Sequence, residues 1–206
     1  MPLRKDGIET KKKILAVCVR LFLEQGYRET TISQIVEEAG VARGLVGDSL
    51  PPVYAYAAET AIQLTLTELN ESLREIYLEA YTLPDTAEYI YLHTTAELKA
   101  IFGANFPRYS DSDFYEMDIG SAGLMRSYMA RKCDIHFPLE RKLERFLTAA
   151  MRMYKVPEAE QAGVLDFIAG LDMQAIAADV MHKLFAMLEM KYDFKLSSGD
   201  EREEEQ

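Results

Sequence analysis

The sequence of 206 residues has little of several features that would place it in a specialised class of protein. It has only two cysteines, so it is not built on a disulfide framework. With 11 Gly, 7 Pro, 49% apolar and 28% charged residues, it is neither collagen-like, mucin-like nor wholly disordered. No apolar run approaches the roughly 20 residues that span a bilayer, and the start MPLRKDGIETKKK holds no apolar segment of a secretory signal. We therefore expect a cytoplasmic protein with no membrane partner, built as one medium domain or as a small domain plus a larger one.

Charge is distributed unevenly along the chain, whose formal net charge is −11. Residues 1–50 hold eight basic and seven acidic side chains, a net charge of +1, and five of the eight basic residues lie within the first 13 positions. The remainder holds 15 basic and 27 acidic side chains, a net charge of −12. Basic patches attract nucleic acid and acidic surfaces repel it. The basic start is therefore either a solvated terminus or an arm that contacts phosphates.

The first 50 residues have the periodicity of three helices joined by tight turns. The pattern predicts a helix over 9–25, a second helix capped by Thr30 or Thr31, and a third short helix over about 42–49. Gly26 is placed to end the first helix in a left-handed conformation. Leu50-Pro51-Pro52 ends the third, because Pro clashes with a preceding helical residue. Two short helices at a tight turn after a supporting helix form helix-turn-helix geometry.

The rest of the chain is helical in pattern almost throughout, with no strand of useful length and no internal repeat. The pattern predicts helices over about 53–83, 85–103, 113–133, 138–154 and 158–190. The first of these is expected to be one long helix, because 53–83 contains no Gly or Pro. The acidic tail 197–206 is expected to be disordered. The expected fold class is all-α.

The helix-turn-helix stretch carries a set of residues at fixed spacing. They are Thr10-Lys11-Lys12-Lys13-Ile14-Leu15, Leu21-Phe22, Gly26-Tyr27, Thr30-Thr31-Ile32, Ile35, Ala39-Gly40-Val41 and Gly44-Leu45. With this set, residues 10–50 resemble the TetR family of bacterial transcription regulators. The resemblance implies that Gly44 lets the recognition helix lie close to DNA, and that the N-terminus of the helix capped by Thr31 points at a phosphate.

The resemblance also implies a set of DNA-contacting residues. They are Lys11, Lys12, Arg28, Thr31, Ser33, Gln34, Ala42, Arg43, Gly44, Asp48 and Ser49. The sequence departs from the family pattern at Gly47, where relatives commonly have Tyr, and at Val53, where they commonly have Lys. Asp48 brings a negative charge toward the groove, although a carboxylate can also accept from cytosine N4. Two accounts remain open: a dimer that still reads a palindrome, or the same fold with DNA binding weakened or lost.

In relatives the later helices form a small-molecule pocket and a dimer interface. The resemblance places the pocket among the helices at 53–83, 85–103 and 113–133. Our candidates for its lining are Tyr89, His93, Phe102, Met117, Met125 and Tyr128, with His93 and Tyr128 as the polar groups that orient a ligand. The acidic balance of this part of the chain favours a cationic or neutral ligand over an anion. The helices at about 138–155 and 158–190 are the expected homodimer interface, which would space two heads on a palindromic operator.

The sequence lacks the common signals of catalysis and of metal binding. It has no glycine-rich phosphate loop, no Gly-x-Ser-x-Gly and no His-Glu-x-x-His. Cys133 and His136 are three positions apart but have no second half of a metal site. Four acids stand near a Gly-containing stretch: Asp111, Asp113, Glu116 and Asp118. Their order does not match a calcium loop, and we expect them to be solvated loop charges plus a helix cap. No enzyme activity, cofactor or metal is expected.

These features together predict an all-α homodimeric regulator of transcription. Residues 1–50 would form a helix-turn-helix DNA-binding domain, 51–196 a helical domain that binds an effector and dimerises, and 197–206 a disordered tail. The expected function is ligand-responsive binding to a palindromic operator, most simply as a repressor. The alternative is a ligand-binding or interaction dimer of the same fold that has lost specific DNA binding.

Overall fold

The computed structural model describes residues 50–192, with side chains as far as His182. In this range the chain forms seven α-helices, one short 3-10 helix and one isolated bridge between Asp134 and Phe137. In chain order they are α3 (Pro52–Leu69), α4 (Glu71–Ala80), α5 (Pro84–Phe102), η2 (Gly103–Asn105), α6 (Asp111–Ala130), α7 (Leu139–Met153), α8 (Glu158–Ala169) and α9 (Met173–Tyr192). The all-α class is therefore confirmed. The expected helix-turn-helix of residues 1–49 lies outside the described residues.

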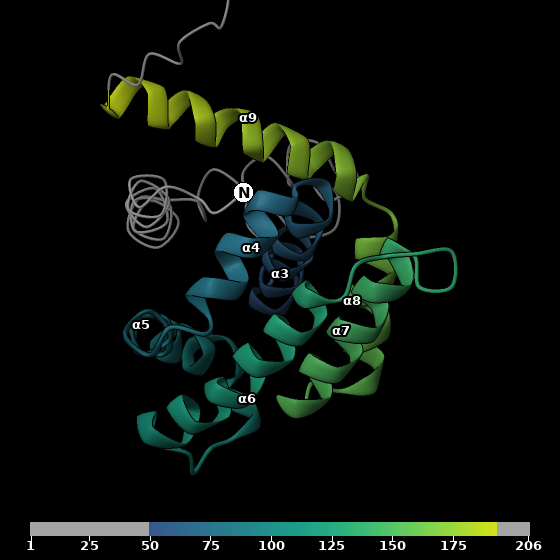
Figure 1. Ribbon diagram of the computed structural model, residues 1–206. Helices are drawn as coiled ribbons and strands as arrows, with labels where there is room; N and C mark the ends of the chain where they lie inside the picture. The colour runs from purple at the N-terminus through teal and green to yellow at the C-terminus, as the bar shows by residue number, and fades with distance from the viewer. Residues whose placement is uncertain (1–49, 193–206) are drawn as a thin grey trace, which may run out of the picture.

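Helix α3 is the central element of the bundle. Pro51 caps it and Pro52 stands in its first turn, where a proline loses no hydrogen bond. Its side chains are buried on almost every face, and it contacts α4, α5, α6, α7, α8 and α9. Figure 1 shows α3 in the middle of the molecule, with α9 crossing one end and α5 and α6 at the other. No helix among residues 50–192 is both long enough and apolar enough to cross a membrane.

Two of the predicted helices were wrong in length, because each is divided into two. The expected helix over 53–83 breaks at Asn70, whose backbone is extended (φ −140°, ψ 116°) and whose side chain accepts a hydrogen bond from the Leu73 N–H at 3.0 Å. The amide competes with the helix for backbone donors and starts α4 as an N-cap. The expected helix over 158–190 breaks after Gly170, and the Asp172 carboxylate accepts from the Ala175 N–H at the start of α9.

A buried ion pair joins α3 to α7. The Lys142 side chain is completely buried, and its Nζ donates to the Glu68 carboxylate and to the Arg131 carbonyl. Glu68 also accepts from the Cys133 N–H at 3.0 Å, and Arg74 lies 3.7 Å away. Burial acts to raise the pKa of Glu68, but these donors and positive charges outweigh it and hold the pKa below its usual value. The cluster fixes the ends of α3, α4, α6 and α7 against one another.

Candidate ligand site in the helical body

An aromatic cluster occupies the space between α3, α5 and the end of α7. The Phe102 ring stacks on the Tyr154 ring with centroids 4.2 Å apart and planes 6° from parallel. The Tyr56 ring meets both of them edge-on, at 5.1 Å from Phe102 and 6.1 Å from Tyr154. All three side chains are buried. These three rings form a packed aromatic cluster next to the polar groups described below.

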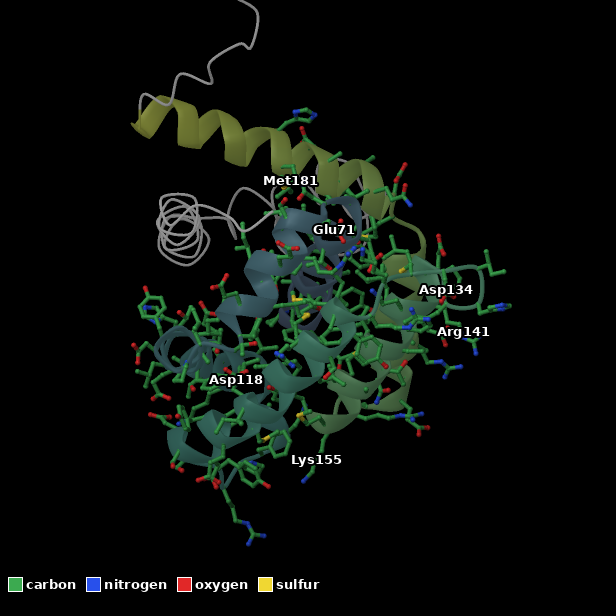
Figure 2. All side chains as sticks on the ribbon, in the orientation of Figure 1. Glu71, Asp118, Asp134, Arg141, Lys155 and Met181 are labelled. Atoms are coloured by element: carbon green, nitrogen blue, oxygen red, sulfur yellow. The ribbon has the colours of Figure 1, made fainter. Side chains whose placement is uncertain are left out.

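Asp118 lies beside this cluster, so the expectation that it is a solvated charge was wrong. Its side chain is only 5% exposed. Figure 2 labels it on α6, near α5, whereas Asp134 and Arg141 lie toward the edge of the view. It lies in register with Phe114 and Met125, which are both buried, at the spacing of one helix face. In the sequence, the position of Asp118 on the apolar face of this helix was the pattern that could have indicated its burial.

Asp118 is held by a short chain of neutral hydroxyl groups. Ser121 donates to its Oδ1 at 2.8 Å, and the Tyr154 hydroxyl donates to Ser121 Oγ at 2.9 Å. Thr94 of α5 hydrogen-bonds to the other carboxylate oxygen, Oδ2. Asn105 donates to the Tyr154 carbonyl at 2.9 Å and so anchors the far end. The chain connects α5, η2 and α6 with the end of α7.

The surroundings of Asp118 disfavour its charged form. Burial raises the pKa of this carboxyl group above its ordinary value, and the hydrogen bonds from Thr94 and Ser121 offset that only in part. Thr94 has one hydroxyl proton and two acceptors within reach, because the Ile90 carbonyl also lies 2.9 Å from its Oγ1. When Thr94 donates to Ile90, a protonated Asp118 can donate to Thr94, so the network also suits the neutral acid.

The negative charge of Asp118 affects the pKa of three tyrosine hydroxyl groups. Burial raises the pKa of Tyr56, Tyr81 and Tyr154, and the negative charge of Asp118 raises each of them further. For Tyr154 the hydrogen bond to Ser121 opposes the rise. These tyrosines come from α3, from the turn after α4 and from the end of α7. They therefore stay neutral at any physiological pH and surround Asp118 with polar but uncharged groups.

The candidate lining residues fall into two groups. Phe102 and Met125 are buried in the core, and Met117 and Tyr128 pack against it. The Tyr128 ring lies edge-on to Phe146, with centroids 5.7 Å apart. His93 lies on the exposed face of α5, and its ring packs on Tyr89 with centroids 3.9 Å apart. Tyr89 and His93 therefore do not lie on the same side of α5 as Phe102. Their assignment to the pocket stays a prediction.

The other acids of the Gly-containing stretch lie where the sequence suggested. Asp113 and Ser110 form a reciprocal capping box at the start of α6, which confirms the expected helix cap. Asp111 pairs with Lys99 at the surface, and Glu116 is exposed. No group of three or more His, Cys, Asp or Glu that could hold a metal ion occurs among the described residues.

None of the expected DNA contacts from Lys11 to Ser49 falls within the described residues. Val53, which occupies the position where relatives commonly have Lys, is only 8% exposed and belongs to the hydrophobic core of α3. The side chain at this position therefore packs the start of α3 against the rest of the bundle.

A groove of about 840 Å³ runs between α7 and α8. Its apolar lining includes Leu139, Leu143, Leu165, Ile168 and Leu171. Its charged lining is Glu140, Arg141, Glu144, Arg145, Asp166 and Asp172. The groove thus carries apolar side chains and both signs of charge on α7, on α8 and on the residues from Leu171 to the start of α9.

Comparison with known proteins agrees with the resemblance stated from the sequence. Residues 14–46 match the family model described as bacterial regulatory proteins, tetR family. No curated protein and no solved structure matches the chain. The match confirms the resemblance and supports membership of the TetR family. A TetR-type N-terminal segment followed by an all-helical body supports a DNA-binding regulator in general.

Proposed function

We propose that this protein is a ligand-responsive repressor of transcription that acts as a homodimer on a palindromic operator. Residues 1–50 bind DNA, 51–196 bind an effector and dimerise, and 197–206 form an acidic tail. The protein acts in the cytoplasm and without catalysis. A ligand changes DNA affinity only by the difference in its affinity for the two conformations of the dimer.

The observation that carries this proposal is the position of α3. The TetR-type segment ends at residue 46, and α3 begins at Pro52. From there α3 runs through the centre of the bundle and places Tyr56 against Phe102 and Tyr154, next to the Asp118 network. A change in the packing around these rings reaches the first turn of α3 directly. Pro51 stands directly before that turn, and its ring fixes the backbone angle φ with which the chain enters α3.

For the homodimer we propose the faces of α7 and α8. Their groove carries leucines together with side chains of both signs, a composition that suits contact with a second copy of itself across a two-fold axis. Helix α9 is a separate helix that begins at Met173 and packs along α3. We therefore propose that the interface is formed by α7 and α8, with the first residues of α9 at the edge of their groove.

One observation favours the second candidate, a dimer of this fold without specific DNA binding. Gly47 and Asp48 replace residues that relatives use at the end of the recognition helix. Val53 stands where relatives commonly have a lysine, and its side chain is buried. Each missing phosphate contact lowers the slope of log affinity against log salt by about one unit.

Enrichment of bound duplexes from a random library, with the full-length protein, tests the proposal. A dimeric reader enriches an inverted repeat with half-sites about 10 base pairs apart, or a multiple of that spacing. Arg43→Ala should abolish the enrichment without changing the circular dichroism spectrum. Failure to enrich any motif over successive rounds would contradict the proposed repressor and favour the second candidate.

A further inference from the structure

Asp118 is a buried acid for which the described residues provide no opposite charge. The described ion pairs of Glu68, Glu71, Asp111 and Asp134 do not involve Asp118. Its hydrogen-bond donors are hydroxyl groups, which stabilise a carboxylate less than a cation does. A carboxylate taken out of water without a charged partner is costly. A positively charged group that reached Asp118 would remove this cost.

We propose that Asp118 anchors a site for an organic monocation, a primary ammonium group carried on an apolar or aromatic skeleton. The inference deepens the proposed function, on which it rests, because it names the chemical class of the effector. The acid comes from α6, its flanking hydroxyls from Thr94 and Ser121, and the adjacent aromatic rings from Phe102 and Tyr154.

The hydrogen bond that an ammonium would replace is the one from Thr94. Thr94 Oγ1 lies 2.9 Å from the Ile90 carbonyl, so its hydroxyl proton keeps an acceptor when Asp118 Oδ2 is taken by another donor. No buried donor is left unsatisfied by this exchange, which keeps its cost low. Thr94 is only half-buried, so the exchange takes place at the edge of the network nearest to solvent.

The groups around Asp118 suit an organic cation and do not suit a metal ion. A Mg²⁺ or Ca²⁺ site needs several oxygen ligands, usually with more than one carboxylate. Asp118 is the only carboxylate of its network, and the described residues contain no metal-binding cluster. The phenols of Tyr56 and Tyr154 lie close enough to feel the charge of Asp118 and are themselves uncharged, and the half-buried Thr94 puts the Oδ2 side of the carboxylate nearest to solvent.

Binding at Asp118 has a path to α3 through two hydrogen bonds and one ring contact. Ser121 links Asp118 to the Tyr154 hydroxyl, and the Tyr154 ring meets the Tyr56 ring of α3. A cation that repositions Asp118 changes the acceptor offered to Ser121 and with it the position of Tyr154. The proposed function requires an effector that changes the packing of α3 in this way.

Isothermal titration calorimetry on the full-length protein tests the site with matched probes. The cations are 2-phenylethylammonium and 4-phenylbutylammonium, and the neutral controls are the alcohols with the same carbon skeletons. We expect each ammonium to bind at least about tenfold more tightly than its alcohol. Asp118→Asn should remove this preference, because the amide keeps the shape of the side chain and loses the charge. Glu116→Gln removes one charge from the exposed face of the same helix and should leave the preference intact.

Equal affinity of the alcohols and the ammonium ions for the wild-type protein would overturn the inference. An unchanged preference in Asp118→Asn would overturn it too, as would the absence of ammonium binding at concentrations up to about 10 mM. Circular dichroism and the Tm of each variant check that it is folded. The DNA enrichment described above separates the two claims. Ammonium binding without DNA binding would refute the repressor alone, and DNA binding without ammonium binding would refute this inference alone.

Discussion

Replacement of the buried Lys142 tests the ion pair that joins α3 to α7. Lys142→Met keeps the length of the apolar stem and removes an ammonium group with no solvent exposure. It leaves Glu68 with the Cys133 N–H and with Arg74 at 3.7 Å, and it takes the donor away from the Arg131 carbonyl. After the substitution, the Glu68 carboxylate has lost one of its partners and the Arg131 carbonyl has lost the hydrogen bond from Lys142.

The expected loss is about 3 kcal/mol of the free energy of unfolding. Breaking a buried ion pair costs about 3–5 kcal/mol, and the lower end applies because Glu68 keeps two other partners. Glu68→Gln should cost a similar amount, because it leaves the ammonium group of Lys142 buried without a counter-charge. The double variant should be no less stable than either single variant, since the second change removes the stranded partner. The coupling free energy is then about 3 kcal/mol.

Urea unfolding followed by circular dichroism at one fixed protein concentration measures these differences. A loss of about 3 kcal/mol corresponds to a fall in Tm of about 6–12 °C for a chain of this size. Lys99→Met is the matched control, because the Lys99–Asp111 pair is exposed and should change stability by less than about 1 kcal/mol. Additive effects of Lys142→Met and Glu68→Gln, or a loss from Lys142→Met no larger than the control's, would refute the reasoning.

Further predictions concern the Asp118 network, the aromatic cluster and the break at Asn70. The pKa of Asp118 is raised in the folded protein, so its protonated form stabilises the fold at low pH and this contribution is lost as the pH rises through the folded pKa. Asp118→Asn should therefore raise the Tm at pH 8 more than at pH 4, and an equal change at both would contradict the assignment. Phe102→Ala removes a completely buried ring stacked on Tyr154 and should cost about 3–5 kcal/mol in urea unfolding; a loss below about 1 kcal/mol would refute the packing. Asn70→Ala removes the cap on the Leu73 N–H and should cost about 1 kcal/mol, whereas Asn70→Gly should cost only a few tenths.

The arrangement of helices could be predicted from the sequence where apolar periodicity and proline agreed. The expected helices over 85–103, 113–133 and 138–154 lie within a few residues of α5, α6 and α7. Pro84 and Pro138 mark two of the starts, and both fit the beginning of a helix. Local signals were sufficient here because the boundary is set by residues close in sequence.

The two breaks and the buried acid could not be predicted in the same way. Asn70 and Gly170 are both tolerated inside helices, so neither residue alone predicts a break. The breaks appear in the structure with the caps that Asn70 and Asp172 form at the starts of α4 and α9. Asp118 was interpreted by its charge and by its acidic neighbours, although it lies in register with Phe114 and Met125. The partners that make its burial possible, Thr94 and Tyr154, lie on other helices, and sequence spacing does not reveal such contacts.

The measurement that tests the central claim most directly is the anisotropy of a labelled duplex titrated with full-length protein over a series of salt concentrations. The duplex most enriched from the random library is compared with a scrambled duplex of the same composition. The proposed repressor predicts a preference of at least about 1,000-fold for the enriched duplex. It also predicts that log affinity falls with log salt by about 0.9 for each phosphate contact. Equal affinity for both duplexes at every salt concentration would contradict the account and leave a helical ligand-binding dimer without a DNA-reading function.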